Sequence, residues 1–197
     1  MSLHTKSQEE LVERNYKTTV GFWIYLMTDS ILFASLFAMY VVLRPGVAAG
    51  PSSAEIFQMP MVLAETIILL VSSLTCGLAL LAFRYKHPRQ AMGFLLATFI
   101  AGLGFLAIEL TEFGTLISEG HSWTQSAFLS GFFTLVATHG IHIAVGLLWL
   151  VVLVIMYKKR GMTPKIARQF GLFGLFWHFL DLIWIFIFTV VYLGGVI

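Results

Sequence analysis

Five long apolar stretches account for most of this 197-residue sequence. Each is continuously apolar rather than alternating, and the five lie at about residues 21–43, 58–83, 90–118, 127–156 and 169–195. A helix needs about 20 apolar residues to cross the hydrocarbon core of a bilayer, so every stretch is long enough. Strands are excluded, because membrane strands alternate apolar and polar residues and open sheet edges cannot stay unpaired in lipid. The pattern predicts an all-α polytopic membrane protein with five transmembrane helices.

The basic residues fall into every second gap between these stretches. Eleven of the twelve Lys and Arg residues precede the first stretch, follow the second or follow the fourth, and only Arg44 lies elsewhere. Short cytoplasmic loops are enriched in Lys and Arg. We therefore expect a cytoplasmic N-terminus and, after five spans, a periplasmic C-terminus. Residues 1–20 would form a short cytoplasmic tail, with no removable signal peptide, and residues 21–197 a single transmembrane domain.

Composition narrows the class of function. With 58% hydrophobic and 11% charged residues, the chain has no segment large enough for a separate soluble domain, which disfavours catalysis in an aqueous lobe. The net charge of +2 requires no acidic partner beyond lipid headgroups, so we expect no nucleic-acid partner. An odd number of spans disfavours the simplest two-half inverted repeat of secondary transporters. The single cysteine, Cys76, cannot form an internal disulfide.

Ionisable residues inside the predicted spans are the candidate functional residues, because such residues are rare in membranes and mark functional sites. They are Asp29, Glu65, Glu109, Glu112, His139, His142, His178 and Asp181. Six of them form pairs three residues apart, which places both members on one helix face. From a rise of about 1.5 Å per residue, Glu109 and His139 have similar depths, and so do His142 and Asp181. We expect these residues to pair across helices.

Three interpretations of the buried polar residues remain open. They could clamp helices together through hydrogen bonds, each worth about 1 kcal/mol in a membrane. They could form a proton path, since protonatable groups occur at two depths. They could bind metal, because carboxylates and histidines three apart are similar to the ligands of di-iron bundles, although the Glu-x-x-His signature is absent. Haem ligation is a further alternative, through His139, His142 or His178.

Three tryptophans are candidates for packing or for a lipid groove. Trp23 lies near the inner end of the first span, where aromatic residues form interfacial belts. Trp177 and Trp184 are seven residues apart on one face of the last span. We expect them to line a helix contact or a groove for lipid.

Four motifs occur in a fixed order along the chain: Gly21-Phe-Trp-Ile-Tyr-Leu-Met-Thr-Asp-Ser, Glu109-Leu-Thr-Glu-Phe, Thr138-His-Gly-Ile-His and Trp177-His-Phe-Leu-Asp-Leu-Ile-Trp. In these motifs and their spacing, from about residue 20 to residue 195, the chain resembles subunit III of haem-copper terminal oxidases. Seven-helix members carry two additional N-terminal spans, and the five-span form looks like the bo-type ubiquinol oxidase subunit 3. Asp29 occupies a position where many seven-helix relatives have Glu, which keeps the carboxylate but shortens its reach.

The resemblance implies an accessory subunit in a bacterial inner membrane. Haem, copper and ubiquinone would belong to partner subunits, and this chain would hold no catalytic residue and no metal. The implied partners are the catalytic subunit I, subunit II, a small subunit IV and phospholipids bound between helices. The complex would oxidise ubiquinol, reduce oxygen to water and pump protons, and this chain would stabilise it and support proton uptake. Alternatives are an accessory subunit of a nitric oxide reductase, a free-standing proton carrier and a membrane metalloenzyme.

Overall fold

The computed structural model describes residues 3–46, 59–120 and 123–196. Regular structure in this part of the chain is entirely helical, and its elements are α1 (Leu3–Leu43), α3 (Met59–Arg84), α4 (Pro88–Ser118), α5 (Ala127–Arg160), α6 (Pro164–Ile187), the π-helical η1 (Phe188–Leu193) and α7 (Gly194–Val196). Within it, five segments are long and apolar enough to cross a membrane: Tyr16–Leu43, Met59–Arg84, Pro88–Ser118, Ala127–Arg160 and Pro164–Leu193. The prediction of an all-α fold with five spans is confirmed.

Capping residues determine where α5 and α6 begin, just before their apolar stretches. Ser126 Oγ accepts a hydrogen bond from the Leu129 backbone N–H at 3.1 Å, and this bond starts α5. Thr163 Oγ1 accepts one from the Ile166 N–H at 3.2 Å at the start of α6. Pro164 follows in the first turn, where its missing N–H costs nothing. Helix α6 therefore begins five residues before the apolar stretch from which its span was predicted.

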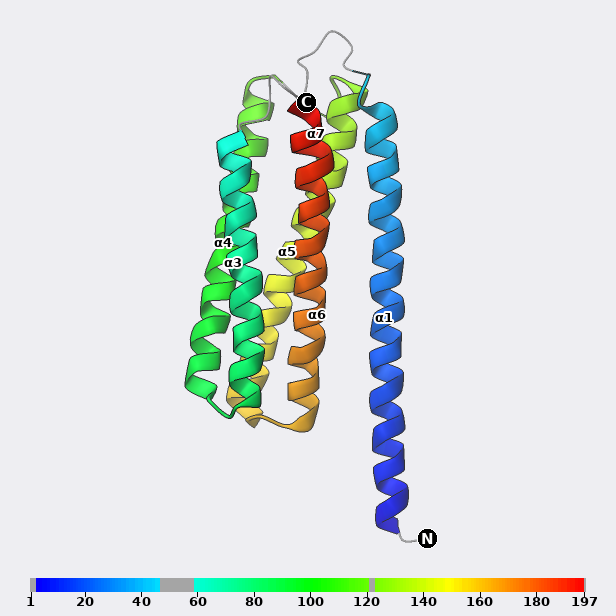
Figure 1. The fold of residues 1–197 in the computed structure, drawn as a ribbon, viewed down its shortest axis with the longest axis vertical. Helices are drawn as coiled ribbons and strands as arrows, with labels where there is room; N and C mark the ends of the chain where they lie inside the picture. Colours follow the sequence, from blue (N-terminus) through cyan, green and yellow to red (C-terminus); the bar gives the residue numbers. More distant parts are fainter. Residues whose placement is uncertain (1–2, 47–58, 121–122, 197) are drawn as a thin grey trace.

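Helix α1 continues through the polar N-terminal residues. No Gly or Pro occurs before Gly21, so nothing in this segment interrupts a helix that starts at Leu3. Its N-terminal end extends beyond the ends of the other helices (Figure 1). The residues predicted as a tail are thus a helical extension of the first span.

The helices differ in how firmly they are held. Helix α3 makes its most extensive contact with α4, and α6 packs against both α3 and α5. In Figure 1, α6 lies between α3 and α1. Helix α1 contacts mainly α5 and, less extensively, α6. It therefore has less lateral support than the helices of the α3–α6 bundle.

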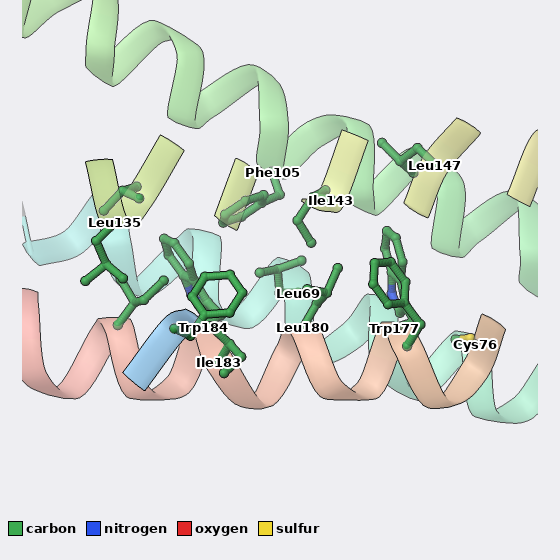
Figure 2. Packing of buried hydrophobic residues seen from close by; sticks show 14 of the residues in the cluster. Leu69, Cys76, Phe105, Leu135, Ile143, Leu147, Trp177, Leu180, Ile183 and Trp184 are labelled. Carbon is green, nitrogen blue, oxygen red and sulfur yellow. The ribbon is translucent and has the colours of Figure 1, made fainter. Parts of the chain in front are cut away.

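Trp177 is packed between three helices and fixes their spacing. A Cβ at Gly102 of α4 or at Gly146 of α5 would lie 3.0 or 2.9 Å from a carbon of its indole ring, so glycine at both positions makes room for the ring. The indole Nε1 donates a hydrogen bond to Ser72 Oγ of α3 at 2.8 Å. Figure 2 shows the ring projecting from α6 into the buried cluster.

Trp184 repeats this arrangement two turns further along α6. Its Nε1 donates to Thr66 Oγ1 of α3 at 3.1 Å, and Phe105 of α4 meets its ring edge-to-face at a centroid distance of 4.6 Å. Both tryptophans are buried, so they lie in helix contacts and not at a surface groove. Trp23, by contrast, is exposed on α1.

Candidate functional site

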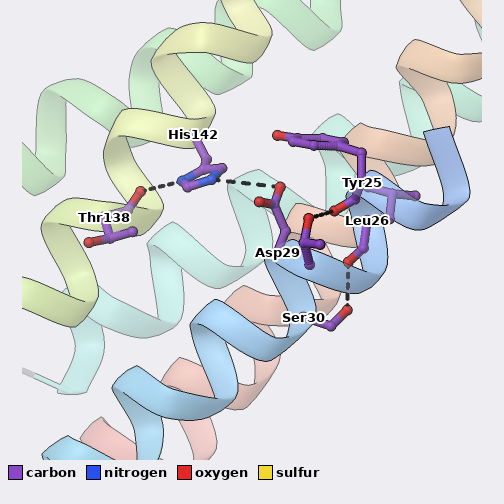
Figure 3. Close-up of polar contacts among 7 residues, drawn as sticks. Tyr25, Leu26, Asp29, Ser30, Thr138 and His142 are labelled. Atoms are coloured by element: carbon purple, nitrogen blue, oxygen red, sulfur yellow. Dashed lines mark hydrogen bonds and ion pairs between the residues drawn. The ribbon is translucent and has the colours of Figure 1, made fainter. Parts of the chain in front are cut away.

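Asp29 of α1 and His142 of α5 face each other across the contact between these helices (Figure 3). Asp29 Oδ2 lies 3.8 Å from His142 Nε2, and their side chains are 11% and 18% exposed. His142 Nδ1 lies 2.7 Å from the carbonyl oxygen of Thr138. A carbonyl can only accept, so Nδ1 carries the proton in this bond.

This geometry leaves room for one proton between the two groups. With Nδ1 committed as a donor, a neutral His142 presents the lone pair of Nε2 toward Asp29, and a lone pair facing a carboxylate is unfavourable. One additional proton, either on Nε2 or on the carboxyl group, would remove this conflict. Tyr25 lies beside the carboxyl (Figure 3), and the ring centroid of Phe33 lies 5.2 Å from that of the imidazole. The pair is therefore a candidate proton site.

The predicted pairing of Asp181 with His142 is wrong. His142 turns toward α1, whereas Asp181 lies beside Ser73 of α3 and His178 of its own helix. The two residues were expected to pair because their predicted depths are similar. Their side chains point toward different helices, so they do not meet.

A second group of acidic side chains joins α3 to α4. Glu65, Glu109 and Glu112 are close enough to interact electrostatically. Tyr192 donates to Glu112 Oε2 at 3.5 Å. Neither carboxyl oxygen of Glu65 or of Glu109 has a hydrogen-bond partner among the described residues, and both side chains are buried. Burying several carboxylates without a counter-charge is costly, which makes this acid cluster a candidate functional site.

His139 lies next to this cluster but is enclosed by aromatic rings. Its ring centroid is 5.3 Å from that of Trp184, 5.8 Å from that of Phe105 and 6.4 Å from that of Phe33. Neither ring nitrogen has a hydrogen-bond partner in the described part of the chain. The predicted pairing with Glu109 is therefore wrong, because the Glu109 carboxyl packs against Gly140, where a Cβ would lie 3.0 Å from Oε1.

His178 and Asp181 occupy a third position, on the contact between α3 and α6. Ser73 Oγ lies 2.7 Å from His178 Nδ1, and Asp181 is adjacent to both residues. His178 is exposed and Asp181 is half-buried. The eight candidate residues thus separate into a pair, an acid cluster, an enclosed histidine and a surface group.

The described residues contain no group of three or more His, Cys, Asp or Glu side chains arranged to hold a metal ion. Tyr192 was not among the candidate residues from the sequence, but it is fully buried against Glu112. The seven-residue spacing from Trp177 through Trp184 to Val191 could have indicated this burial, because it places the end of the span on the same buried face.

Replacing His139 by Phe tests whether its imidazole makes a buried hydrogen bond. Without a partner, the buried nitrogens are unfavourable, so we expect His139→Phe to leave stability unchanged or to raise it by about 1–3 kcal/mol. As a matched control, His142→Phe loses the bond to the Thr138 carbonyl and is expected to cost about 1 kcal/mol. Thermal unfolding of the purified protein in mild detergent measures both. A larger loss of stability for His139→Phe than for His142→Phe would show that the His139 imidazole makes a hydrogen bond, contrary to the structure.

Comparison with known proteins identifies one protein family along nearly the whole chain. The cytochrome c oxidase subunit III family matches residues 5–196. The cytochrome bo(3) ubiquinol oxidase subunit 3 of Pseudomonas putida is 50% identical over 91% of this chain and 87% of its own length. The cytochrome c oxidase subunit 3 of Bacillus sp. (strain PS3) is 46% identical over 90% and 86%, and the quinol oxidase subunit 3 of Bacillus subtilis (strain 168) 42% over 89% and 86%. This chain therefore belongs to the cytochrome c oxidase subunit III family.

Proposed function

We propose that this chain is subunit III of a bo-type ubiquinol oxidase in a bacterial inner membrane. The observation that carries the proposal is its identity of 50% and 52% to two Pseudomonas proteins named cytochrome bo(3) ubiquinol oxidase subunit 3. The basic residues support a cytoplasmic N-terminus, with the helical extension of α1 on that side. The partners are the haem-copper catalytic subunit I, subunit II and a small subunit IV. Haem, copper and ubiquinone belong to partner subunits, and this chain has a non-catalytic role in the complex.

We propose further that Asp29 and His142 support proton uptake by the catalytic subunit. The pair lies within the spans of α1 and α5, is incompletely buried and accommodates one proton at either of two atoms. Such a site can take a proton between turnovers and return it during the next one. Its loss would not remove any redox centre.

Phospholipid binding is the third part of the proposal. An apolar groove of about 520 Å³ lies between α4 and α5, lined by Leu96, Phe99, Leu150 and Val154 among others, with Lys158 at its basic end. The apolar walls suit acyl chains, and the ammonium suits an anionic headgroup of the cytoplasmic leaflet.

Purification of the tagged chain from its native membrane in mild detergent tests the assignment. We expect a larger haem-bearing subunit to copurify, with an optical spectrum of b- and o-type haem and with ubiquinol oxidation by the preparation. A nitric oxide reductase as the partner would replace the ubiquinol oxidase assignment. A colourless chain without partners would contradict it and would favour a free-standing proton carrier.

Asp29→Asn tests the proton-supply role in the assembled oxidase. The amide keeps the shape of the side chain but cannot exchange a proton, so we expect normal haem content, near-normal initial turnover and an activity that decays several-fold sooner. Oxygen consumption followed over many turnovers measures this. Ser35→Ala is the control, since that hydroxyl bonds only to the Ile31 carbonyl of its own helix. An unchanged lifetime in Asp29→Asn would reject the role.

Lys158→Gln tests the lipid site. The loss of one lysine near the headgroup removes about 1 kcal/mol, so we expect anionic phospholipid to be retained about fivefold less well during detergent washing. Lys165→Gln, outside the groove lining, is the control. Mass spectrometry of the intact complex counts the bound lipid. Equal retention in both variants would contradict this location.

A further inference from the structure

His178 is exposed near the middle of the membrane. It lies close to the centre of the span Pro164–Leu193, about 20 Å from either end at 1.5 Å per residue. Among the eight candidate Asp, Glu and His residues that the structure describes in the spans, His178 alone is exposed; the other seven are buried or half-buried. A polar ring facing lipid tails at this depth is unfavourable, because the tails offer no hydrogen bond.

The hydrogen bonds of the His178 group are incomplete within the described chain. His178 Nδ1 is satisfied by Ser73 Oγ at 2.7 Å, but Nε2 has no partner there, and neither has Asp181 Oδ1. Gly77 leaves space beside the ring, since a Cβ would come no closer than 3.9 Å to its Cε1 and Nε2. In either tautomer the exposed imidazole still requires a partner at Nε2. Asp181 Oδ1 is buried, so a second molecule does not reach it.

Exposed hydroxyl groups in the spans bond back to their own helices. The hydroxyls of Thr28 and Ser35 on α1 donate to the backbone carbonyls of Tyr25 and Ile31. The hydroxyl of Thr134 on α5 donates in the same way to the carbonyl of Ser130. Such back-bonded hydroxyls are compatible with contact to lipid. His178 differs from them because its exposed Nε2 needs a group from outside this chain.

The surface around His178 has the form of a helix-docking site. On α6, His178 continues a stripe of exposed residues at helical spacing, formed by Leu175, Leu182 and Ile185. On α3, next to it, exposed Leu70, Leu74 and Leu81 flank Gly77 at the same spacing. A small residue lets a neighbouring helix approach closely, and a polar side chain between apolar ones provides an interhelical hydrogen bond.

We propose that this α3–α6 surface is where a transmembrane helix of another oxidase subunit docks, with a polar side chain placed opposite the exposed His178 Nε2. The proposal rests on the proposed function, since it takes the partner from the same complex. Lipid is a poorer occupant, because its tails leave the imidazole nitrogen unsatisfied.

Photocrosslinking in the intact complex tests the surface. A photoreactive phenylalanine analogue replaces Leu182, one turn from His178, and in a second sample Leu148 on α5, an exposed residue on another face, to give the background. We expect illumination of native membranes to join the Leu182 probe to another oxidase subunit well above that background. Adducts only with lipid, or only with a second copy of this chain, would overturn the proposal.

A substitution gives an independent readout. We expect His178→Leu to weaken retention of this chain in the complex about threefold to tenfold under increasing detergent, as expected for the loss of one interhelical hydrogen bond. Thr134→Val, which removes a back-bonded hydroxyl, is the control and should retain the chain normally. Normal retention of His178→Leu together with lipid-only crosslinks would reject the interface while leaving the subunit assignment intact. Absence of every other oxidase subunit from the wild-type preparation would reject the subunit assignment itself.

Discussion

The hydrocarbon interior offers no hydrogen bonds, and this constraint determines most of the structure. Polar groups inside the spans must find partners in the protein, so the indoles of Trp177 and Trp184 reach serine and threonine on α3, and exposed hydroxyls bond back to their own helices. These bonds tie α6 to α3 at two levels. Groups that remain unsatisfied are therefore informative, because retaining them has a free-energy cost.

The unsatisfied groups fall into two kinds with different uses. Glu65, Glu109 and His139 are buried within the bundle. Asp29, His178 and Asp181 lie nearer the surface of the chain, where the proposed proton exchange and partner contact would take place. An accessory subunit needs both kinds of contact, since it must hold its own shape and fit a larger assembly.

Sequence was sufficient for the fold but only for part of the site. Apolar length and the positions of Lys and Arg predicted the spans, because a bilayer imposes a fixed thickness on any helix that crosses it. The depth of each ionisable residue followed from the helical rise. Its partner did not, because pairing depends on how each helix is rotated about its axis. Hence His142 was assigned to Asp181 although it meets Asp29, and Glu109 to His139 although its carboxyl packs against Gly140. The family could be identified because four motifs occur in a fixed order. No single pair of residues would have been specific enough.

The weak lateral support of α1 has a mechanical consequence. Asp29 is carried by the helix with the fewest contacts to its neighbours, whereas His142 is carried by the well-packed α5. A single helix adjusts its tilt when its hydrophobic length and the bilayer thickness do not match. A thinner or thicker membrane would thus change the separation of the carboxyl and imidazole groups before it disturbed the rest of the bundle. Lipid composition would then influence the proton exchange proposed for this pair.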